Sequence, residues 1–305
     1  MPRIYHQQFP IRYYECDPYG HVNNAHYLRY ATEAALGASA DAGYDSARYA
    51  ELGTTWWIRE AGIEYLRPAR YGETLDVKTW VSDFRRVRSR REYEMTIMGT
   101  DELAARAWTD WIYLDQQTGQ PGRIPPGMQL AFFPEGAPSA APRRTPFPAP
   151  PSAPPGAFRA RRRVRWHQLD MVGHMNNAWY LSLLEDVAID AAESRGWPMQ
   201  RSTEAGFGIV AREHRIEYVR PAQLGEDLAV TTYIGEFRRA SATRHYRIEV
   251  DEGPDAGTLV ARAQTLWVWI NLETVRPMAI PEDILTDFTP QIAEFEAPPS
   301  LAGGA

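Results

Sequence analysis

The residues best suited to chemistry form a short pattern, in which an aspartate is followed by Gly-His and then by two asparagines. The pattern begins at Asp17, contains Gly20, His21 and Asn23, and ends at Asn24. Glycine permits a sharp bend, and asparagine is a good helix cap. The carboxylate is therefore expected beside the free N–H groups at the positive end of a helix. Such a place suits an acid that acts on an acyl group.

The chain contains this pattern twice. The second copy begins at Asp170, contains Gly173, His174 and Asn176, and ends at Asn177. At the constant offset of 153, positions 9 to 93 show 33 identities in 85 without a gap. Self-similarity of this length indicates a duplicated domain of roughly 120 residues rather than a short structural repeat.

The elements that must position these residues follow the same order in each copy. In the first copy, strand-forming residues occupy positions 3–16. Small and apolar residues then recur at helical spacing from Ala25 to about Asp41. Four stretches rich in Trp, Tyr, Ile, Val and Thr predict strands near 55–66, 74–84, 88–99 and 103–115. The prediction is an α+β fold with one long helix and an antiparallel sheet in each copy.

A proline-rich segment separates the two copies. Residues 121–157 hold 12 of the 24 prolines and show no periodicity. A chain of this composition is extended and semi-rigid, so it can cross the face of a domain and let the halves pack side by side. The predicted organisation is a first domain over 1–120, this linker, a second domain over 158–287 and a tail over 288–305.

Composition excludes several classes of protein. The net charge of -6 gives no overall support for a nucleic-acid partner. The only cysteine, Cys16, leaves no internal disulfide and no thiolate cluster for zinc. The sequence has no recognisable signal peptide and no apolar run of membrane-spanning length, so the predicted location of the protein is the cytoplasm. No metal or organic cofactor is expected.

A second sequence pattern, in addition to the Asp motif, also occurs in both copies. The segment from Arg59 to Ala69 reads Arg-x3-Ile-Glu-Tyr-x-Arg-Pro-Ala, and it recurs from Arg212 to Ala222. Together with the Asp motif, it resembles the hotdog-fold thioesterases of the 4-hydroxybenzoyl-CoA thioesterase type. The resemblance implies two tandem hotdog domains, each a long central helix wrapped by an antiparallel sheet, packed as an intramolecular pseudo-dimer. It leaves further homo-oligomerisation open.

The resemblance also implies roles for residues. The family's acid, here Asp17 and Asp170, acts as nucleophile or as base for water. The backbone N–H of Asn24 and Asn177 polarises the thioester carbonyl. From their place in the motif, and not from the resemblance, His21 and His174 are candidates to orient the acid or a substrate carbonyl. The remaining candidates are substrate-binding residues: Gly20, Gly173, Asn23, Asn176, Tyr27, Tyr180, Arg59, Arg212, Arg85 and Arg86. The implied activity is acyl-CoA hydrolysis; acyl-carrier-protein thioesters and a non-catalytic acyl-CoA-binding module are the alternatives.

Structural roles compete with these assignments. The Asp and Asn side chains could serve only as helix caps, and the histidines could be bonded to backbone.

Plant-type acyl-carrier-protein thioesterases have Asn two positions before the His, where this chain has Tyr19 and Val172. Glu33 and Asp186 occupy equivalent helix positions. Because Glu33 is about 13 Å along the helix from its start, it is too far from the same acyl carbon.

Overall fold

The computed structural model describes residues 1–100, 102–136 and 144–293. The first repeat contributes the strands β1 (Ile4–Pro10), β2 (Thr54–Tyr65), β3 (Thr74–Phe84), β4 (Arg88–Ile97) and β5 (Leu103–Asp115). The second contributes β6 (Phe158–Arg163), β7 (Phe207–Tyr218), β8 (Asp227–Phe237), β9 (Ser241–Val250) and β10 (Leu259–Asn271). In the described part of the chain these form one antiparallel sheet, in the order β1-β3-β4-β5-β2-β7-β10-β9-β8-β6.

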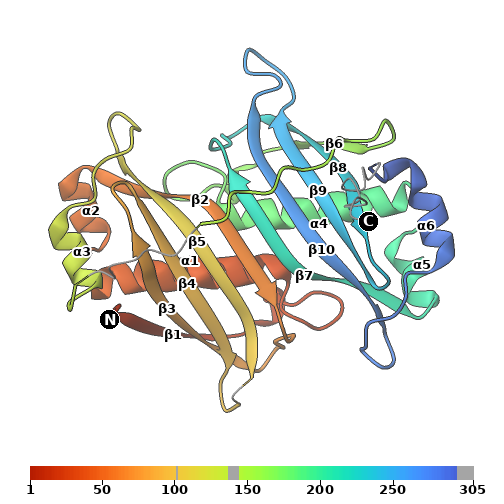
Figure 1. The fold of residues 1–305 in the computed structure, drawn as a ribbon, viewed down its shortest axis with the longest axis horizontal. Coiled ribbons are helices and arrows are strands. Elements are labelled where there is room, and N and C mark those ends of the chain that lie inside the picture. The colour runs from red at the N-terminus through yellow and green to blue at the C-terminus, as the bar shows by residue number, and fades with distance from the viewer. Residues whose placement is uncertain (101, 137–143, 294–305) are drawn as a thin grey trace, which may run out of the picture.

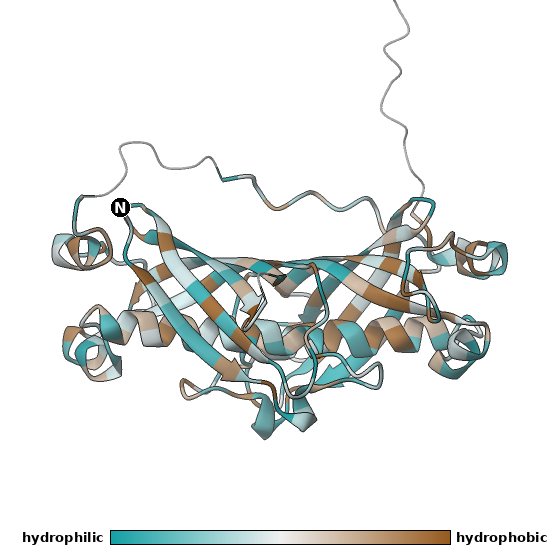
Figure 2. Ribbon diagram, turned by 90° about the horizontal axis from the view of Figure 1, so that it is seen from below, coloured by the Kyte–Doolittle hydropathy of each residue, from teal (hydrophilic) through white to brown (hydrophobic). Residues whose placement is uncertain are grey.

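One long helix of each repeat lies against the same face of this sheet, α1 (Asn24–Asp41) and α4 (Asn177–Glu193). They run in opposite directions from the centre of the molecule, beneath the arching sheet (Figures 1 and 2). The shorter helices lie toward the two ends: α2 (Ser46–Leu52), α3 (Pro126–Phe132), α5 (Met199–Glu204) and α6 (Glu282–Phe288). Single 3-10 turns are η1 (Tyr13–Glu15), η2 (Trp166–Gln168) and η3 (Thr289–Gln291).

The predicted helical pattern of the first repeat corresponds to the buried face of α1. Leu28, Ala31, Ala35 and Ala38 are all buried there. Such small side chains allow a helix axis to approach a sheet closely. The turn after the helix contains Gly43 with a φ of 84°, a conformation that glycine adopts without a Cβ penalty.

The repeats join edge to edge through β2 and β7, which pair over five residue pairs. Two arginines related by the duplication brace this junction. Arg59 donates a hydrogen bond to the carbonyl oxygen of Tyr218, and Arg212 donates one to that of Tyr65. A single apolar cluster of buried residues spans both repeats. The two halves therefore share one core.

The segment between the repeats has more structure than its composition predicted. It includes α3, whose Met128 and Phe132 are buried against the first repeat. Residues 144–157 then cross the sheet face opposite the long helices (Figure 2). Along the way Arg144 pairs with Asp83 at 3.0 Å, and the carbonyl oxygen of Pro151 accepts a hydrogen bond from Tyr233. Residues 137–143 and the tail beyond 293 lie outside the described residues.

Candidate active site

The loop before α1 holds the carboxylate of Asp17 by its own backbone. One carboxylate oxygen, Oδ1, accepts hydrogen bonds from the N–H groups of Tyr19 at 2.9 Å and His21 at 3.1 Å. The loop closes because the N–H of Gly20 donates to the Asp17 carbonyl oxygen at 2.9 Å, with Gly20 at a φ of 75°. This glycine therefore has the positive φ that the motif implied.

The second copy has the same geometry. Oδ1 of Asp170 accepts from the N–H of Val172 at 3.0 Å and from that of His174 at 3.3 Å. Gly173 has a φ of 82°. The duplicated motif thus builds two closely similar loops, one at the start of each long helix.

Each helix start presents a free amide beside this loop. Oδ1 of Asn23 caps α1 by accepting from the N–H of Ala25 at 3.0 Å, and Asn176 caps α4 in the same way. Among the described residues, no acceptor contacts the backbone N–H of Asn24 or Asn177, which begin the two helices. First-turn amides have no partner within a helix. Each can therefore bind an oxygen from outside.

A second carboxylate reaches the Asp17 loop from the other repeat. Glu185, in the middle of α4, accepts a hydrogen bond from Nδ2 of Asn23 at 2.7 Å. At the offset of 153 its counterpart is Thr32, whose hydroxyl instead bonds to the carbonyl oxygen of Leu28. The sequence pattern pointed to Glu33 and Asp186, one position further on, and gave no indication of Glu185. Its signal was a difference between the copies rather than an identity.

The electrostatics of the Asp17 loop favour neutral forms. Burial raises the pKa of Asp17, although hydrogen bonds from the backbone and the nearby Arg70 oppose that shift. Burial also raises the pKa of Glu185, and the carboxylate of Asp17 adds to the effect. The pKa of His21 is lowered, first by burial and then by Arg70. The pKa of His21 is therefore below its ordinary value and the pKa values of the two acids are above theirs, so each shift favours the uncharged form.

The surroundings of the two loops differ. The hydroxyl of Tyr19 lies against the start of β7, where a Cβ on Gly208 would meet it at 3.3 Å. The equivalent Val172 is exposed. At the second loop, the ring of Trp57 packs edge-on against His174, with centroids 5.2 Å apart. The Asp17 loop is thus walled by the other repeat on two sides, by β7 and by α4.

Other predicted binding residues have structural partners. The buried hydroxyls of Tyr27 and Tyr180 accept hydrogen bonds from the N–H groups of Ala69 and Ala222. Arg59 and Arg212 are occupied at the junction of the repeats, as described above. The last two candidates, Arg85 and Arg86, are exposed at the β3–β4 turn. Arg85 also forms an ion pair with Asp83 there. Arg70, which forms an isolated backbone β-bridge with His21, lies near the opposite end of β3 from that turn.

The described part of the chain contains no group of three or more His, Cys, Asp and Glu side chains placed to hold a metal ion. None of its helices is both long enough and apolar enough to cross a membrane.

Comparisons of the sequence with known proteins match both repeats. The model of the thioesterase-like superfamily matches residues 11–132 and 164–288. The long-chain acyl-CoA thioesterase FadM of Escherichia coli is 31% identical over 118 residues, covering 39% of this chain and 86% of that protein. The chloroplastic acyl-(acyl-carrier-protein) hydrolase FATB2 of Cuphea viscosissima is 24% identical over 202 residues, covering 63% of this chain. The chain spans about half the length of that plant relative, 49%.

Solved structures share the fold across nearly the whole chain. A protein from Lactobacillus plantarum assigned as an oleoyl thioesterase aligns with a TM-score of 0.72 at 20% identity, covering 88% of this chain and 96% of that chain. The 12:0-ACP thioesterase from Umbellularia californica aligns with a TM-score of 0.68 at 18% identity, covering 87% and 93%. The predicted pair of hotdog domains, joined as an intramolecular pseudo-dimer, is confirmed. The chain belongs to the thioesterase-like superfamily and has its double-hotdog form.

Proposed function

We propose that the protein hydrolyses acyl thioesters and that the Asp17 loop is its active site. The observation that carries this proposal is the meeting of three groups from both repeats. The carboxylate of Asp17 is close enough to that of Glu185 to raise its pKa, and Glu185 accepts a hydrogen bond from Asn23. The next residue, Asn24, begins α1 with a free N–H. A nucleophile or base beside an oxyanion donor is the arrangement that acyl transfer requires.

The chemistry assigned to each group follows from its environment. Asp17 attacks the thioester carbonyl or removes a proton from the attacking water. The N–H of Asn24 stabilises the oxyanion, and a donor of this kind is typically worth about 2.7–4 kcal/mol of barrier. Glu185 is a positioning residue, because it holds Nδ2 of Asn23 and so fixes the helix start.

We assign the second loop a lesser role. Asp170 has the same backbone bonds as Asp17, but Thr32 replaces the opposing carboxylate and the adjacent Val172 is exposed. An open loop without a second acid provides less exclusion of water, and electrostatic effects are weaker in a wet site. Turnover therefore depends mainly on Asp17.

The substrate we propose is an acyl-CoA. The name of the bacterial relative FadM specifies an acyl-CoA, and the chain covers 86% of that protein. The plant relative's name specifies an acyl-carrier-protein substrate, which is the second candidate. A carrier protein must dock, whereas CoA binds as a small molecule, so the two differ in their demand on the surface.

The test is a hydrolysis screen that follows release of the free thiol. Acyl-CoAs with short, long and aromatic acyl groups are compared with the matching acyl-carrier-protein thioesters. We expect turnover of acyl-CoA that the Asp17→Asn variant loses. Faster turnover of every carrier-protein thioester would favour the second candidate. Tight binding of acyl-CoA without turnover by the unaltered protein would contradict the enzymatic proposal and identify a binding module.

A further inference from the structure

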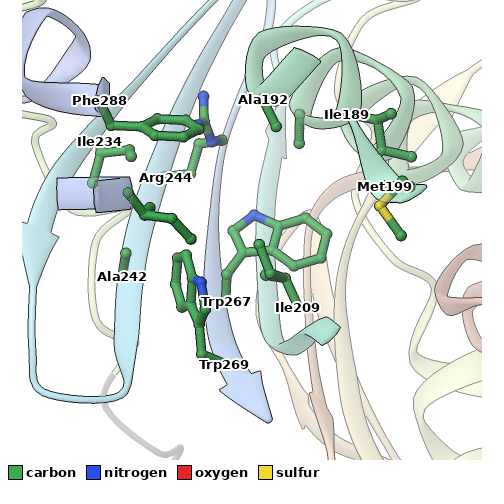
Figure 3. A pocket seen from close by; sticks show the side chains of 12 residues that line it. Ile189, Ala192, Met199, Ile209, Ile234, Ala242, Arg244, Trp267, Trp269 and Phe288 are labelled. Carbon is green, nitrogen blue, oxygen red and sulfur yellow. The ribbon is translucent and has the colours of Figure 1, made fainter. Parts of the chain in front are cut away.

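An apolar cavity lies at the far end of α4, between that helix and the sheet of the second repeat. Its volume is about 80 Å³, and its wall is formed mainly by Ile, Ala, Trp and Phe side chains. One charged residue, Arg244 on β9, also lines it (Figure 3). A guanidinium in an apolar wall is unusual, because burying a charge is costly unless it is paired.

Within the described residues, Arg244 has no acidic partner. Its side chain is 5% exposed. The only hydrogen bond that its guanidinium makes to a described residue is a long one, 3.4 Å from Nη1 to the hydroxyl of Thr232. The ring of Phe288 lies 5.9 Å from the guanidinium carbon, at the outer limit of a cation–π contact (Figure 3). Arginine remains protonated in proteins, so the cavity wall includes a positive charge whose donors are largely unused.

A second unused donor lines the same cavity. The indole N–H of Trp269 is buried, and no acceptor within the described residues contacts it. Buried tryptophan N–H groups usually have a partner. Arg244 and Trp269 thus place two donors in the wall of one apolar cavity. Among the described residues, the indole N–H has no acceptor and the guanidinium has only the long bond to Thr232. Both would be satisfied by an oxygen-bearing ligand.

The first repeat provides an internal comparison. Its equivalent cavity is lined by Arg91, which is 6% exposed and has no acidic partner among the described residues. There, however, the hydroxyls of Ser39 and Tyr49 line the wall and bond to each other at 2.8 Å. At the position equivalent to Ser39, the second repeat has Ala192. At this position the wall of the cavity around Arg244 is therefore apolar, whereas the wall around Arg91 is polar.

Residues of α4 and β7 lead from the Asp17 loop to the cavity around Arg244. Glu185, which reaches that loop, is followed on the same face of α4 by Ala188 and Ala192, both in the cavity wall. Seven residues of helix separate Glu185 from Ala192, about 10 Å. On the sheet side, Ile209 lines the cavity next to Gly208, which packs against Tyr19. An acyl group held at Asp17 would thus extend along α4 toward Arg244.

We propose that Arg244 and the indole N–H of Trp269 bind a carboxylate at the far end of the acyl group. The preferred substrate class is then the CoA monothioester of a dicarboxylic acid, with an apolar chain between its two ends. This inference rests on the proposed function, because it assigns the Asp17 loop as the place where the thioester is held. Arg244 and Trp269 set specificity and take no part in the bond that breaks.

The test compares acyl-CoAs matched in length: hexanoyl- with adipoyl-CoA, octanoyl- with suberoyl-CoA, and decanoyl- with sebacoyl-CoA. The readout is kcat/KM for hydrolysis. We expect the carboxylated member of at least one pair to be preferred roughly 10- to 100-fold, the range for a hydrogen-bonded charged group. Arg244→Met should reduce that ratio to one or below, and Trp269→Phe should reduce it partly. The matched variant Arg91→Met should leave the ratio unaltered.

A binding arm separates this inference from the proposed function. Calorimetry on the Asp17→Asn variant measures the Kd of each pair without turnover. A carboxylate preference in Kd without hydrolysis by the unaltered protein would reject the proposed function and support the inference. Hydrolysis with no preference for any carboxylated member would reject the inference alone. An ω-hydroxyoctanoyl-CoA that outperforms suberoyl-CoA, or an equal loss of preference in Arg91→Met, would also overturn it.

Discussion

Replacing Asn23 with alanine removes two contacts made by one side chain. Oδ1 caps α1 through the N–H of Ala25 at 3.0 Å, and Nδ2 donates to Glu185 at 2.7 Å. The loss of an asparagine cap costs typically about 1 kcal/mol. The loss of a hydrogen bond to a charged group costs about 1.5–3 kcal/mol. Together, Asn23→Ala should lower the free energy of unfolding by roughly 2.5–4 kcal/mol.

The duplication supplies a matched control. Asn176 caps α4 through the N–H of Ala178 at the same 3.0 Å, and the position facing it is Thr32 instead of an acid. Asn176→Ala should therefore cost only the cap, about 1 kcal/mol. The difference between the two variants isolates the bridge between the repeats.

Equilibrium urea unfolding at pH 7 measures both losses, and a double-mutant cycle of Asn23→Ala with Glu185→Ala measures the coupling between the two side chains. We expect Asn23→Ala to be the more destabilising variant by about 1.5–3 kcal/mol. Equal losses for Asn23→Ala and Asn176→Ala, with no coupling to Glu185, would refute the idea that this hydrogen bond connects the repeats.

Three further predictions follow from the site and the sheet. Because burial raises the pKa of Glu185, the carboxyl group of Glu185 stabilises the fold below its ordinary pKa, and this stabilisation is lost as the pH rises through its raised pKa in the folded protein. Glu185→Gln should therefore raise Tm at pH 7.5. A gain in Tm that persisted at pH 4 would contradict this. Because the pKa of Asp17 is also raised, kcat/KM should fall, as the pH drops, at a higher pH than for a free aspartate, whose pKa is 3.8; a pH–rate profile that stays flat down to that value would be inconsistent. Gly62→Ala would place a Cβ 2.5 Å from the ring of Trp108 and should cost about 1–3 kcal/mol in urea unfolding, whereas Gly122→Ala, with 3.5 Å to its nearest atom, is the control and should cost under about 0.5 kcal/mol.

Much of the fold could be predicted because its signals are local and occur twice. The capping by Asn23, the turn at Gly20 and the small buried face of α1 each depend on neighbours in sequence. The short helix α3 was missed because its proline-rich segment lacks periodicity, and it is held by burial of Met128 and Phe132 against the first repeat.

Some residues of the candidate site could not be predicted from the sequence, for physical reasons. Arg59 and Arg212 were predicted to bind substrate because they are identical in the two copies. In the structure both lie at the junction of the repeats, where they donate hydrogen bonds to backbone carbonyl oxygens. Glu185 went unnoticed because its counterpart is Thr32, and its partner Asn23 lies in the other repeat. A contact between residues so distant in sequence depends on how the two helices pass each other.

Hydrolysis is assigned to Asp17, in the loop walled by the other repeat. The most direct measurement is kcat for Asp17→Asn and Asp170→Asn on the best acyl-CoA, with Tm recorded to confirm folding. We predict that Asp17→Asn lowers kcat by about 10²- to 10⁴-fold, and that Asp170→Asn changes it by only a few-fold. Full activity in a folded Asp17→Asn variant, or a loss confined to Asp170→Asn, would contradict the account.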